Sequence, residues 1–488
     1  MRHLSFSRLL SRTRLFGFLG VVLILMVWIA AASALGTDII PHPWTTVADT
    51  VRLLLQPASW AHFAITMARV LGGFACALVA GTFLGLASAR RELETLLKPA
   101  ILLIQGIPPI LWTIPLILVL GFSQLTPILV IALICLPLVF LNVSEGTRSV
   151  PKELSEMLAV FSPGLLPRLR ELVIPYLRPF FASALRLGLT LGIKASVVAE
   201  YFSANNGIGF QVQAAYHAFQ VRRLFAWTLL LVLLILVFDR LLSRITTAAR
   251  AARHKVPSTV LESCQPGEIS DLRGRFTRKT SGVELELREV SFSYEGHRIL
   301  DRCTLTVRPG TIAVISGDSG TGKTTLLKLT ASILAPESGS VGRPSRIGFV
   351  FQDDRFLPWR TNVGNVSVPL VYDRIDRHSA LCFSSFMMAE VGLRGRQLSF
   401  PEELSGGMKK RLALARCFAA MPEAILLDEP FSGLHRAARA SLWGKFADLF
   451  DRHPAAVIIV THYPEEVPDG LPCSFYTLSG APARLFAV

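Results

Sequence analysis

Apolar residues are distributed unevenly along the chain, and its two halves differ in their pattern of hydrophobic and polar positions. Over residues 1–243, uncharged apolar runs approach the length of about 20 residues that a helix needs to cross a bilayer. From about residue 280, short β-branched runs alternate with charged, helix-forming stretches and turn residues, which is typical of an α/β domain. The pattern therefore predicts a multi-domain chain, with an all-α six-span membrane domain followed by an α/β domain. The predicted spans are 15–35, 63–88, 100–120, 125–143, 178–200 and 224–242.

Composition and charge agree with membrane residence. Hydrophobic residues make up 51% of the chain and charged residues 17%, which leaves little polar surface for a soluble protein of this size. The net charge of +15 is carried largely by arginines and lysines that flank the apolar runs. This is the bias of cytoplasmic loops, although Arg222 and Arg223 go against it, and it places both termini inside the cell. We expect the lipid bilayer as a partner, and no nucleic acid.

The first apolar run has a second interpretation. Basic residues, an apolar core and the small residues Ala32, Ser33 and Ala34 are also features of a cleavable signal peptide. We favour a retained helix, because the run is longer than a typical signal core.

The stretch 244–280 predicts a tether between a membrane domain at 1–243 and a C-terminal domain at 281–488. It is basic and polar, has no apolar periodicity, and contains Pro257, Pro266 and Gly267 as helix breakers. The chain has seven cysteines but no CxxC pair, so we expect free thiols without a metal or disulfide framework.

A phosphate-binding loop stands at the start of the α/β domain, within TIAVISGDSGTGKTTLLKLTASIL (311–334). An apolar run, a glycine-rich turn and a helical pattern follow one another, which is the context that the motif G-x-x-x-x-G-K-[ST] requires. The glycines let backbone N–H groups face phosphate oxygens, Lys323 reaches the β- and γ-phosphates, and the hydroxyl of Thr324 is placed for Mg²⁺. We therefore expect ATP and Mg²⁺ as ligands. The expected contacts with ATP in this loop are Gly317, Asp318, Ser319, Gly320, Thr321, Gly322, Lys323, Thr324 and Thr325.

Two adjacent carboxylates end a second buried-strand pattern, EAILLDEP (423–430). Asp428 is expected to hold Mg²⁺, and Glu429 to polarise the attacking water as general base. Two acids at a strand end also occur in ordinary solvated turns. The phosphate loop in the same domain favours the catalytic interpretation.

Between these motifs, ELSGGMKKRLALARC (403–417) resembles the signature sequence of ABC ATPases. The resemblance covers about residues 283–465 and implies an α/β P-loop ATPase domain. It implies that Ser405, Gly406 and Gly407 cap the γ-phosphate of ATP held by a second subunit. It also implies roles for three further residues. These are Gln352, which senses Mg²⁺ and touches the permease; His462, the catalytic histidine that contacts the γ-phosphate; and Tyr294, which stacks on adenine.

The loop ELSEMLAVFSPGLLPRLRELVIPYLRP (153–179) resembles the EAA coupling loop of bacterial ABC-importer permeases. Glu156, Ser162 and Pro175 fall at the spacing of that pattern, together with Leu172 and Ile174, and are the expected coupling residues. The alternative is an amphipathic helix lying at the membrane surface. The stretches 68–86 and 197–212 look like the nitrate/sulfonate/taurine branch of these permeases.

Together these resemblances imply a permease and an ATP-binding subunit fused in one chain. They imply ATP-driven import of a small anionic or organic solute across the bacterial inner membrane, by a homodimer that takes the solute from an external substrate-binding protein. The ATPase domain is then cytoplasmic. The alternatives are an ABC exporter and a catalytically weak regulatory subunit. His435 bears on the second alternative, because the family usually has an aspartate at that position.

Overall fold

The computed structural model describes residues 3–161, 164–251, 256–264, 267, 269–277 and 284–488. The chain forms two compact units. The first, the helical unit, comprises Met1–Ser149 and Tyr176–Ala251. The second, the sheet unit, comprises Val150–Pro175 and Ala252–Val488. The predicted coupling segment therefore packs as part of the sheet unit, although both its ends continue into helices of the helical unit.

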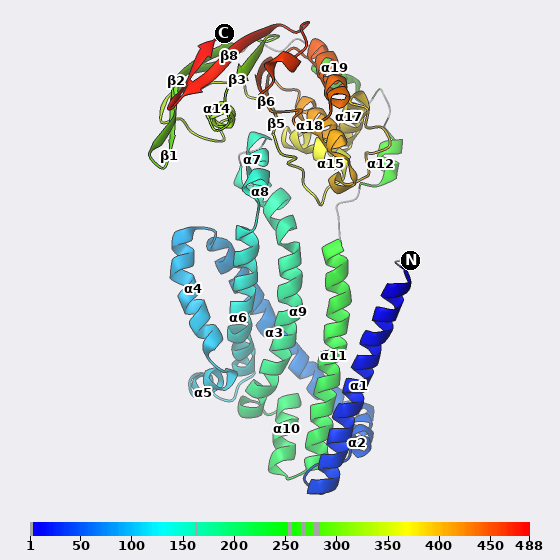
Figure 1. Cartoon of the computed structure of the whole chain (residues 1–488). Helices are drawn as coiled ribbons and strands as arrows, with labels where there is room; N and C mark the ends of the chain where they lie inside the picture. The colour runs from blue at the N-terminus through cyan, green and yellow to red at the C-terminus, as the bar shows by residue number, and fades with distance from the viewer. Residues whose placement is uncertain (1–2, 162–163, 252–255, 265–266, 268, 278–283) are drawn as a thin grey trace. The chain divides into compact units, whose positions relative to one another are not determined.

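The helical unit contains long apolar helices and shorter amphipathic ones (Figure 1). Its helices are α1 (His3–Leu35), α2 (Pro43–Leu55), α3 (Pro57–Ala87), α4 (Arg91–Gly106), α5 (Pro109–Leu120), α6 (Leu125–Arg148), α9 (Ile174–Ser203), α10 (Ile208–His217) and α11 (Val221–Ala251). Among the described residues, five helical segments are long and apolar enough to cross a membrane, and the count becomes six if the bent pair α4 and α5 is one span. The all-α membrane domain is confirmed.

The third predicted span is not one straight helix. The expected segment 100–120 divides into the end of α4 and all of α5, whose axes differ by 95°. Pro108 and Pro109 lie at the break and provide no backbone N–H, and proline disfavours helical geometry in the residue before it. The two prolines therefore account for the bend.

Helices α3 and α6 approach each other closely along a line of glycines. A Cβ atom on Gly81 would lie 2.8 Å from the Val139 side chain, and one on Gly85 would lie 2.8 Å from Val143. Small residues at such contacts let two backbones come together, which is how helices associate in an apolar medium. Larger residues at these positions would separate the pair.

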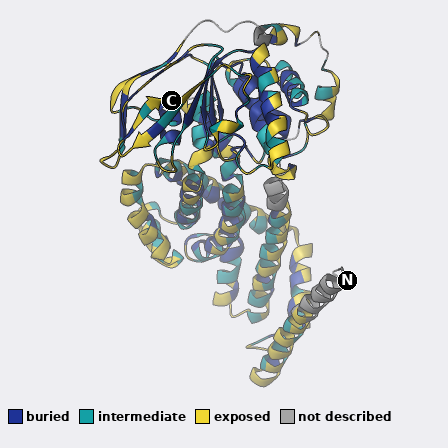
Figure 2. Cartoon of the chain, turned by 45° about the horizontal axis from the view of Figure 1, so that its top comes forward, coloured by how far each residue is buried: buried dark blue, intermediate teal, exposed yellow. Residues whose placement is uncertain are grey.

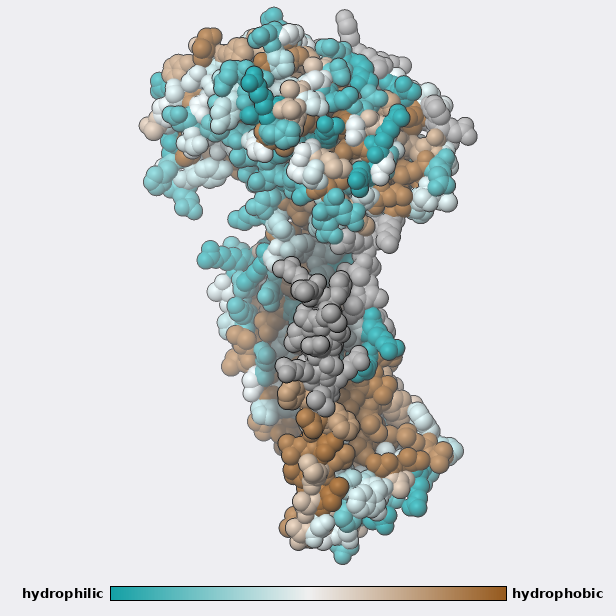
Figure 3. Space-filling model, turned by 45° about the vertical axis from the view of Figure 1, so that its right-hand side comes forward, coloured by the Kyte–Doolittle hydropathy of each residue, from teal (hydrophilic) through white to brown (hydrophobic). Residues whose placement is uncertain are grey.

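Large apolar side chains cover much of the outer surface of the helical unit (Figure 3). In the span of α1, Phe18–Leu35, only 6% of residues are buried, and in the span of α11 the share is 11%. Where its side chains are described, the helix that begins at the N-terminus is accordingly coloured mostly as exposed (Figure 2). Lipid is the environment that such faces require.

A buried polar network connects the helices of this unit. The Arg69 guanidinium on α3 donates a 2.7 Å hydrogen bond to Glu200 on α9, and the two side chains are 3% and 0% exposed. Thr66 also donates to Glu200, at 2.9 Å. Arg69 contacts Gln124 and Asn206 as well. Such a pair persists in an apolar interior because each charge has hydrogen-bonded partners.

The sheet unit is built on one nine-stranded mixed sheet in the order β4-β1-β2-β9-β8-β3-β7-β6-β5. Its strands are β1 (Leu285–Tyr294), β2 (His297–Val307), β3 (Ile312–Ser316), β4 (Ser338–Gly342), β5 (Ile347–Val350), β6 (Ala424–Asp428), β7 (Ala456–Val460), β8 (Cys473–Gly480) and β9 (Ala483–Ala487). Its helices are α7 (Lys152–Phe161), α8 (Leu165–Arg168), η1 (Leu169–Val173), α12 (Ser258–Glu262), α13 (Ser270–Thr277), α14 (Lys323–Thr330), α15 (Asn362–Val366), α16 (Val368–Tyr372), α17 (Arg377–Glu390), η2 (Pro401–Glu403), α18 (Gly406–Ala419), α19 (Arg436–Arg452) and η3 (Pro464–Glu466).

The central strands explain why the sheet forms. Strands β5, β6 and β7 are buried at every position, and β3 at all but its last, as expected for parallel strands covered on both faces. Because these strands run parallel, the phosphate loop after β3 and the acids at the end of β6 emerge at the same edge of the sheet. The predicted α/β class is confirmed.

The segment 244–280 differs from the expected tether. It contains α12 and α13, and Val256, Ile269 and Leu272 are buried in the same apolar core as α17 and α18. The expectation that every cysteine is free is also wrong, because Cys264 forms a disulfide with Cys382, 118 residues away. These contacts could not be predicted from composition, because isolated apolar residues in a polar stretch produce no periodicity.

Candidate functional site

The phosphate loop connects β3 to α14 and curls around the Lys323 amine. Gly317, Gly320 and Gly322 all have positive φ, between 85° and 153°. A Cβ atom on Gly317 would lie 2.4 Å from the Leu478 carbonyl oxygen, so no larger residue fits there. Lys323 donates hydrogen bonds of 2.7 and 2.8 Å to the carbonyls of Gly317 and Asp318. The loop therefore folds back on Lys323, with two of its carbonyl oxygens accepting hydrogen bonds from the lysine amine.

The other predicted loop contacts lie on the same turn. Asp318, Ser319 and Gly320 are exposed at its tip, and the Thr321 hydroxyl donates to the Asp318 carbonyl at 2.9 Å. Thr325 is buried in the first turn of α14. Burial lowers the pKa of the Lys323 amine, and nearby Glu429 and Asp428 partly offset this effect.

Thr324 and Asp428 meet at the edge of the sheet. The Thr324 hydroxyl donates to the Asp428 carboxylate at 2.9 Å, across a sequence separation of 104 residues. Asp428 is 3% exposed, and burial raises its pKa while the hydrogen bond from Thr324 works against that shift. A hydroxyl and a buried carboxylate are hard oxygen donors, and they suit Mg²⁺ better than a softer metal.

Glu429 lies between the two other predicted polar residues. The Gln352 amide donates to one carboxylate oxygen at 3.1 Å, and the His462 Nε2 lies 3.0 Å from the other. The Glu429 backbone has a φ of 43°, in the left-handed region. Such strain in a residue other than glycine often accompanies a functional position. The structure thus brings together Glu429, Gln352 and His462, three residues that were predicted from separate motifs.

The signature residues lie apart from the phosphate loop within one copy of the chain. The Ser405 hydroxyl caps α18 by accepting a hydrogen bond from the Met408 amide, and Gly406 is exposed next to Gly407 at the helix start. Among the described residues, no hydrogen bond joins Ser405, Gly406 or Gly407 to the loop. The exposed N-terminus of α18 is free to receive an anion from outside the chain.

Two further predicted positions have clear local roles. Tyr294 ends β1, is 45% exposed, and packs edge-on against Phe292 with ring centroids 4.8 Å apart. His435 is the N-cap of α19, and its Nδ1 accepts a hydrogen bond from the Ala438 amide at 3.3 Å. Aspartate is a common residue at such a cap, so the imidazole replaces the carboxylate in its capping contact.

The predicted coupling segment packs on the strands and helices that carry the nucleotide motifs. Leu154, Met157, Leu158 and Leu172 are buried in one core with residues of β5 and α14. The Glu156 carboxylate accepts a 2.9 Å hydrogen bond from Lys328 on α14 and a 2.8 Å hydrogen bond from Arg355. Burial alone would raise the pKa of Glu156, but its bonds to Lys328 and Arg355 lower it overall.

A second ion pair fixes the far end of this segment. Glu171 on η1 binds Arg360, which lies eight residues after Gln352. Pro175 is buried just after the π-helical turn η1, within a helical run that continues from Leu165 to Ser203, and Ser162 lies outside the described residues. The interpretation as a helix lying at the membrane surface is disfavoured, because the apolar face of α7 is covered by protein.

The partners of Glu156 were not among the predicted residues. Lys328 lies five residues after the phosphate-loop lysine, and Arg355 three residues after Gln352. The Arg355 guanidinium lies 4.0 Å from the centroid of the Phe351 ring, and its backbone carbonyl accepts from the buried Arg416 on α18. Only this proximity to known motifs could have drawn attention to them, since lysines and arginines are common on helices.

Comparison with known proteins assigns both halves of the chain. Residues 300–432 match the ABC transporter family, and residues 77–250 match the binding-protein-dependent transport system inner membrane component. The aliphatic sulfonates import ATP-binding protein SsuB 3 of Paraburkholderia xenovorans is 37% identical over 188 residues, which are 38% of this chain and 73% of that protein. The corresponding protein SsuB 1 of Nocardia farcinica is 38% identical over 187 residues, 38% of this chain and 75% of its own length.

The chain belongs to the ABC transporter family. It combines a permease domain and an ABC ATPase domain in one polypeptide, and its ATPase is coupled to transport. The solved dimeric structure of MJ0796, a bacterial ABC transporter cassette, is 24% identical, with a TM-score of 0.36 over 40% of this chain and 93% of that one. The ABC transporter is thus a multi-pass membrane protein that uses ATP.

Proposed function

We propose that two copies of this chain form an ABC importer that moves an aliphatic sulfonate, or a closely related small organic anion, across the bacterial inner membrane. A separate substrate-binding protein delivers the solute from outside, and the ATPase domains lie in the cytoplasm. The names of the sulfonate-import relatives support the solute class. The match of the permease half to binding-protein-dependent systems supports the delivery protein.

The residues in the nucleotide site have distinct tasks in this proposal. The phosphate-loop amides and Lys323 bind the phosphates of ATP, and the exposed face of Tyr294 receives the adenine. Thr324, Asp428 and Gln352 would hold Mg²⁺, which neutralises phosphate charge when it is bound. Asp428 and Thr324 are already 2.9 Å apart, so their oxygen atoms form a suitable pair of ligands.

Glu429 acts as the general base. Its carboxylate accepts from Gln352 and lies beside His462, so a nucleotide that attracts these two residues releases the carboxylate to orient a water molecule. His462 then contacts the γ-phosphate. These exchanges make hydrolysis dependent on correct binding of ATP.

The second copy completes the site. Ser405, Gly406 and Gly407 lie at the start of α18, where Ser405 and Gly406 are exposed, and within the described part of the chain no hydrogen bond joins them to the phosphate loop. In the proposed dimer, each signature caps the ATP held by the other chain, and the simplest assembly is a symmetric homodimer. His435 keeps its helix cap, so this substitution gives no reason to expect a silent ATPase.

One observation carries the proposal that hydrolysis drives transport. Glu156, within the loop of the permease, is bound to Lys328 on the same helix that begins with Lys323 and Thr324. Its other partner, Arg355, is three residues from Gln352. A change at the γ-phosphate therefore reaches the permease loop through two short, charged connections.

The test is ATP hydrolysis by the full chain in lipid nanodiscs, with a candidate substrate-binding protein added. We expect hydrolysis to rise when the binding protein carries an alkanesulfonate. If hydrolysis rises with nitrate or a thiamine precursor and not with alkanesulfonates, the proposed solute is wrong. A rate of ATP hydrolysis that no loaded binding protein changes would contradict the importer assignment.

A further inference from the structure

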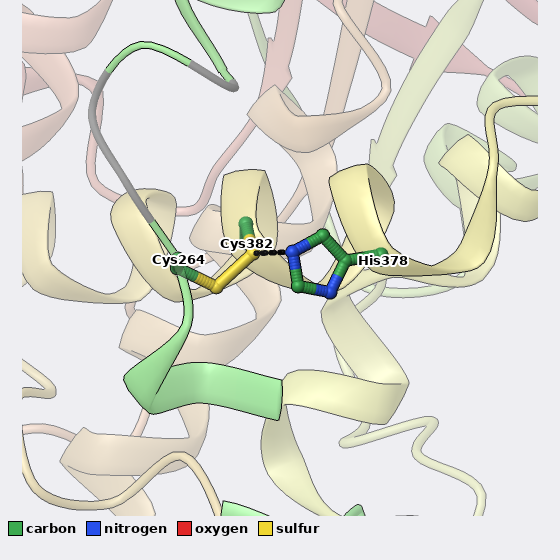
Figure 4. A group of neighbouring side chains, drawn as sticks. All are labelled: Cys264, His378 and Cys382. Carbon is green, nitrogen blue, oxygen red and sulfur yellow. Dashed lines mark hydrogen bonds between the residues drawn. A yellow bond between two sulfur atoms is a disulfide. The ribbon is translucent and has the colours of Figure 1, made fainter. Parts of the chain in front are cut away.

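Three side chains with metal-binding chemistry meet at a place that takes no part in ATP binding. His378 and Cys382 lie four residues apart on α17 and so project from the same face of that helix. Cys264 comes from a different segment, just after α12. Figure 4 shows the three side chains converging, with the His378 ring directed at the sulfur of Cys382.

The geometry of this cluster is compact. One potential ligand atom from each residue lies within 4.8 Å of the other two. The His378 Nε2 is 3.6 Å from the Cys382 sulfur, and the two cysteines, whose Cα atoms are 5.4 Å apart, are joined as a disulfide. Cys382 is 2% exposed, whereas Cys264 and His378 are partly accessible.

The donor set selects a class of metal. Two thiolates and one imidazole are typical ligands for Zn²⁺, and carboxylate-preferring ions such as Mg²⁺ and Ca²⁺ are disfavoured. Two sulfurs on one tetrahedral Zn²⁺ lie about 3.8 Å apart, given Zn–S bonds of about 2.3 Å. Small rotations about the two Cα–Cβ bonds separate the sulfurs by that amount once the disulfide is opened.

We propose that, in its dithiol form, this chain binds one Zn²⁺ ion through Cys264, His378 and Cys382, with water in the fourth position. The inference rests on the proposed function in one respect, namely that the sheet unit lies in the cytoplasm. Reductants in that compartment keep thiols reduced, and cysteines that converge there are more often metal ligands than permanent disulfides.

Opening the disulfide between Cys264 and Cys382 requires a two-electron reductant. A dithiol or phosphine supplies two electrons, the S–S bond breaks, each sulfur takes a proton from water, and the reductant is oxidised. Zn²⁺ then displaces the two thiol protons into solvent and bonds to both thiolates. The disulfide and the metal site are therefore alternative states of the same cysteines.

The site has a mechanical consequence. Cys264 belongs to the stretch that joins α11 to β1, and α17 packs on α18, the helix that begins at the signature. An ion held by both segments fastens this connecting stretch to the helices of the signature region. The bound metal should therefore raise the thermal midpoint of the sheet unit.

Cobalt titration of the purified full chain in detergent tests the proposal. The chain is reduced with a phosphine, freed of metal and titrated with Co²⁺ without oxygen. We expect one Co²⁺ per chain, a sulfur-to-cobalt charge-transfer band and visible bands of tetrahedral intensity, all removed by adding Zn²⁺. Cys264→Ser and Cys382→Ser should each weaken the charge-transfer band, and His378→Ala should reduce affinity by at least about tenfold, the loss that even an outer-shell partner brings.

Cys473→Ser provides the matched control, because Cys473 is a free, partly buried cysteine elsewhere in the sheet unit. Its titration should equal that of the wild type. A band that survives Cys264→Ser, or that disappears equally in Cys473→Ser, would overturn the proposal, as would the absence of any charge-transfer band. ATP binding by each variant verifies that it is folded. The titration does not depend on solute uptake, so failure of import with cobalt binding intact would affect only the proposed function.

Discussion

Removing the Glu156 carboxylate should detach the coupling segment from the ATPase domain. In Glu156→Ala, Lys328 and Arg355 both lose their anionic partner, at 2.9 and 2.8 Å. Arg355 is affected more, because its side chain is 9% exposed and its Nε has no hydrogen-bond partner among the described residues. What remains for its guanidinium is a long 3.4 Å hydrogen bond to the Glu153 carbonyl and the face of the Phe351 ring. The variant therefore leaves a nearly buried cation poorly paired.

The magnitude follows from the exposure of the three side chains. Breaking a fully buried ion pair costs about 3–5 kcal/mol, whereas an exposed pair is worth about 0–1 kcal/mol. Glu156 is 25% exposed and Lys328 18%, which places this network between the two limits, at about 2–3 kcal/mol of docking free energy. At 1.4 kcal/mol for each factor of ten, the ratio of docked to detached segment falls by about 30- to 150-fold.

Hydrogen exchange measures this ratio directly. Amides of α7 exchange when the helix detaches, so their exchange should accelerate by up to the same factor, while amides of β6 and β7 stay unchanged. Solute uptake should fall with ATP binding retained. Glu153→Gln is the matched control, because Glu153 is exposed on the same helix and only its backbone carbonyl contacts Arg355. Unchanged exchange in Glu156→Ala, or equal acceleration in both variants, would refute the reasoning.

The lowered pKa of Glu156 also determines how docking of the coupling segment depends on pH. The pKa of Glu156 is lowered in the folded chain, so its contribution to docking is complete above the ordinary carboxyl pKa of 4.5 and is lost only as pH falls through the lowered value. Between neutral and mildly acidic pH, docking should therefore stay constant. Detachment of α7 on going from pH 7.5 to about 6 would show that another group controls it.

Three further experiments test the nucleotide site and its surroundings. Glu429→Gln should lower ATP turnover by about 10²–10⁴-fold with ATP binding retained, and normal hydrolysis would remove Glu429 as the base. Burial raises the pKa of Asp428, so protons should compete with Mg²⁺ as pH falls; the Mg²⁺ concentration for half-maximal hydrolysis should then rise at low pH, and a constant value would contradict the assignment. His435→Ala should cost about 0.5–2 kcal/mol of stability through loss of the α19 cap, whereas His435→Asp should cost little; equal thermal midpoints for the two would exclude capping.

The nucleotide residues could be predicted because each motif is local and the order of the motifs is informative. The phosphate loop is contiguous from Gly317 to Thr325, and its glycines mark the positions where the backbone turns tightly. Thr324 and Asp428 were both assigned to Mg²⁺ from separate motifs, and their 2.9 Å contact agrees with that assignment. The two-part fold came from the change in apolar run length near residue 243.

Contacts between segments that are distant along the chain could not be predicted from the sequence. Glu156 is 172 residues from Lys328 and 199 from Arg355, and Cys264 is 118 residues from Cys382. No local periodicity links such pairs, because tertiary packing alone decides them. The bend between α4 and α5 could be predicted in part, since prolines within an apolar run are compatible with a broken helix, but whether they bend a span or end it depends on the neighbouring helices.

His435 illustrates a third limit. The sequence shows that a carboxylate is absent, but the capping contact depends on the extended backbone of residue 435 and on the direction of its ring. A residue can therefore depart from a family pattern and still preserve the local contact.

The central claim is that hydrolysis at Glu429 drives solute inward through the permease of the same chain. The most direct measurement is uptake of a labelled alkanesulfonate into proteoliposomes that contain ATP, with the binding protein outside. The wild-type chain should accumulate the solute only with ATP present, and Glu429→Gln should accumulate none. Equal accumulation by the Glu429→Gln variant, or ATP-driven transport from the ATPase side to the opposite side, would contradict the account.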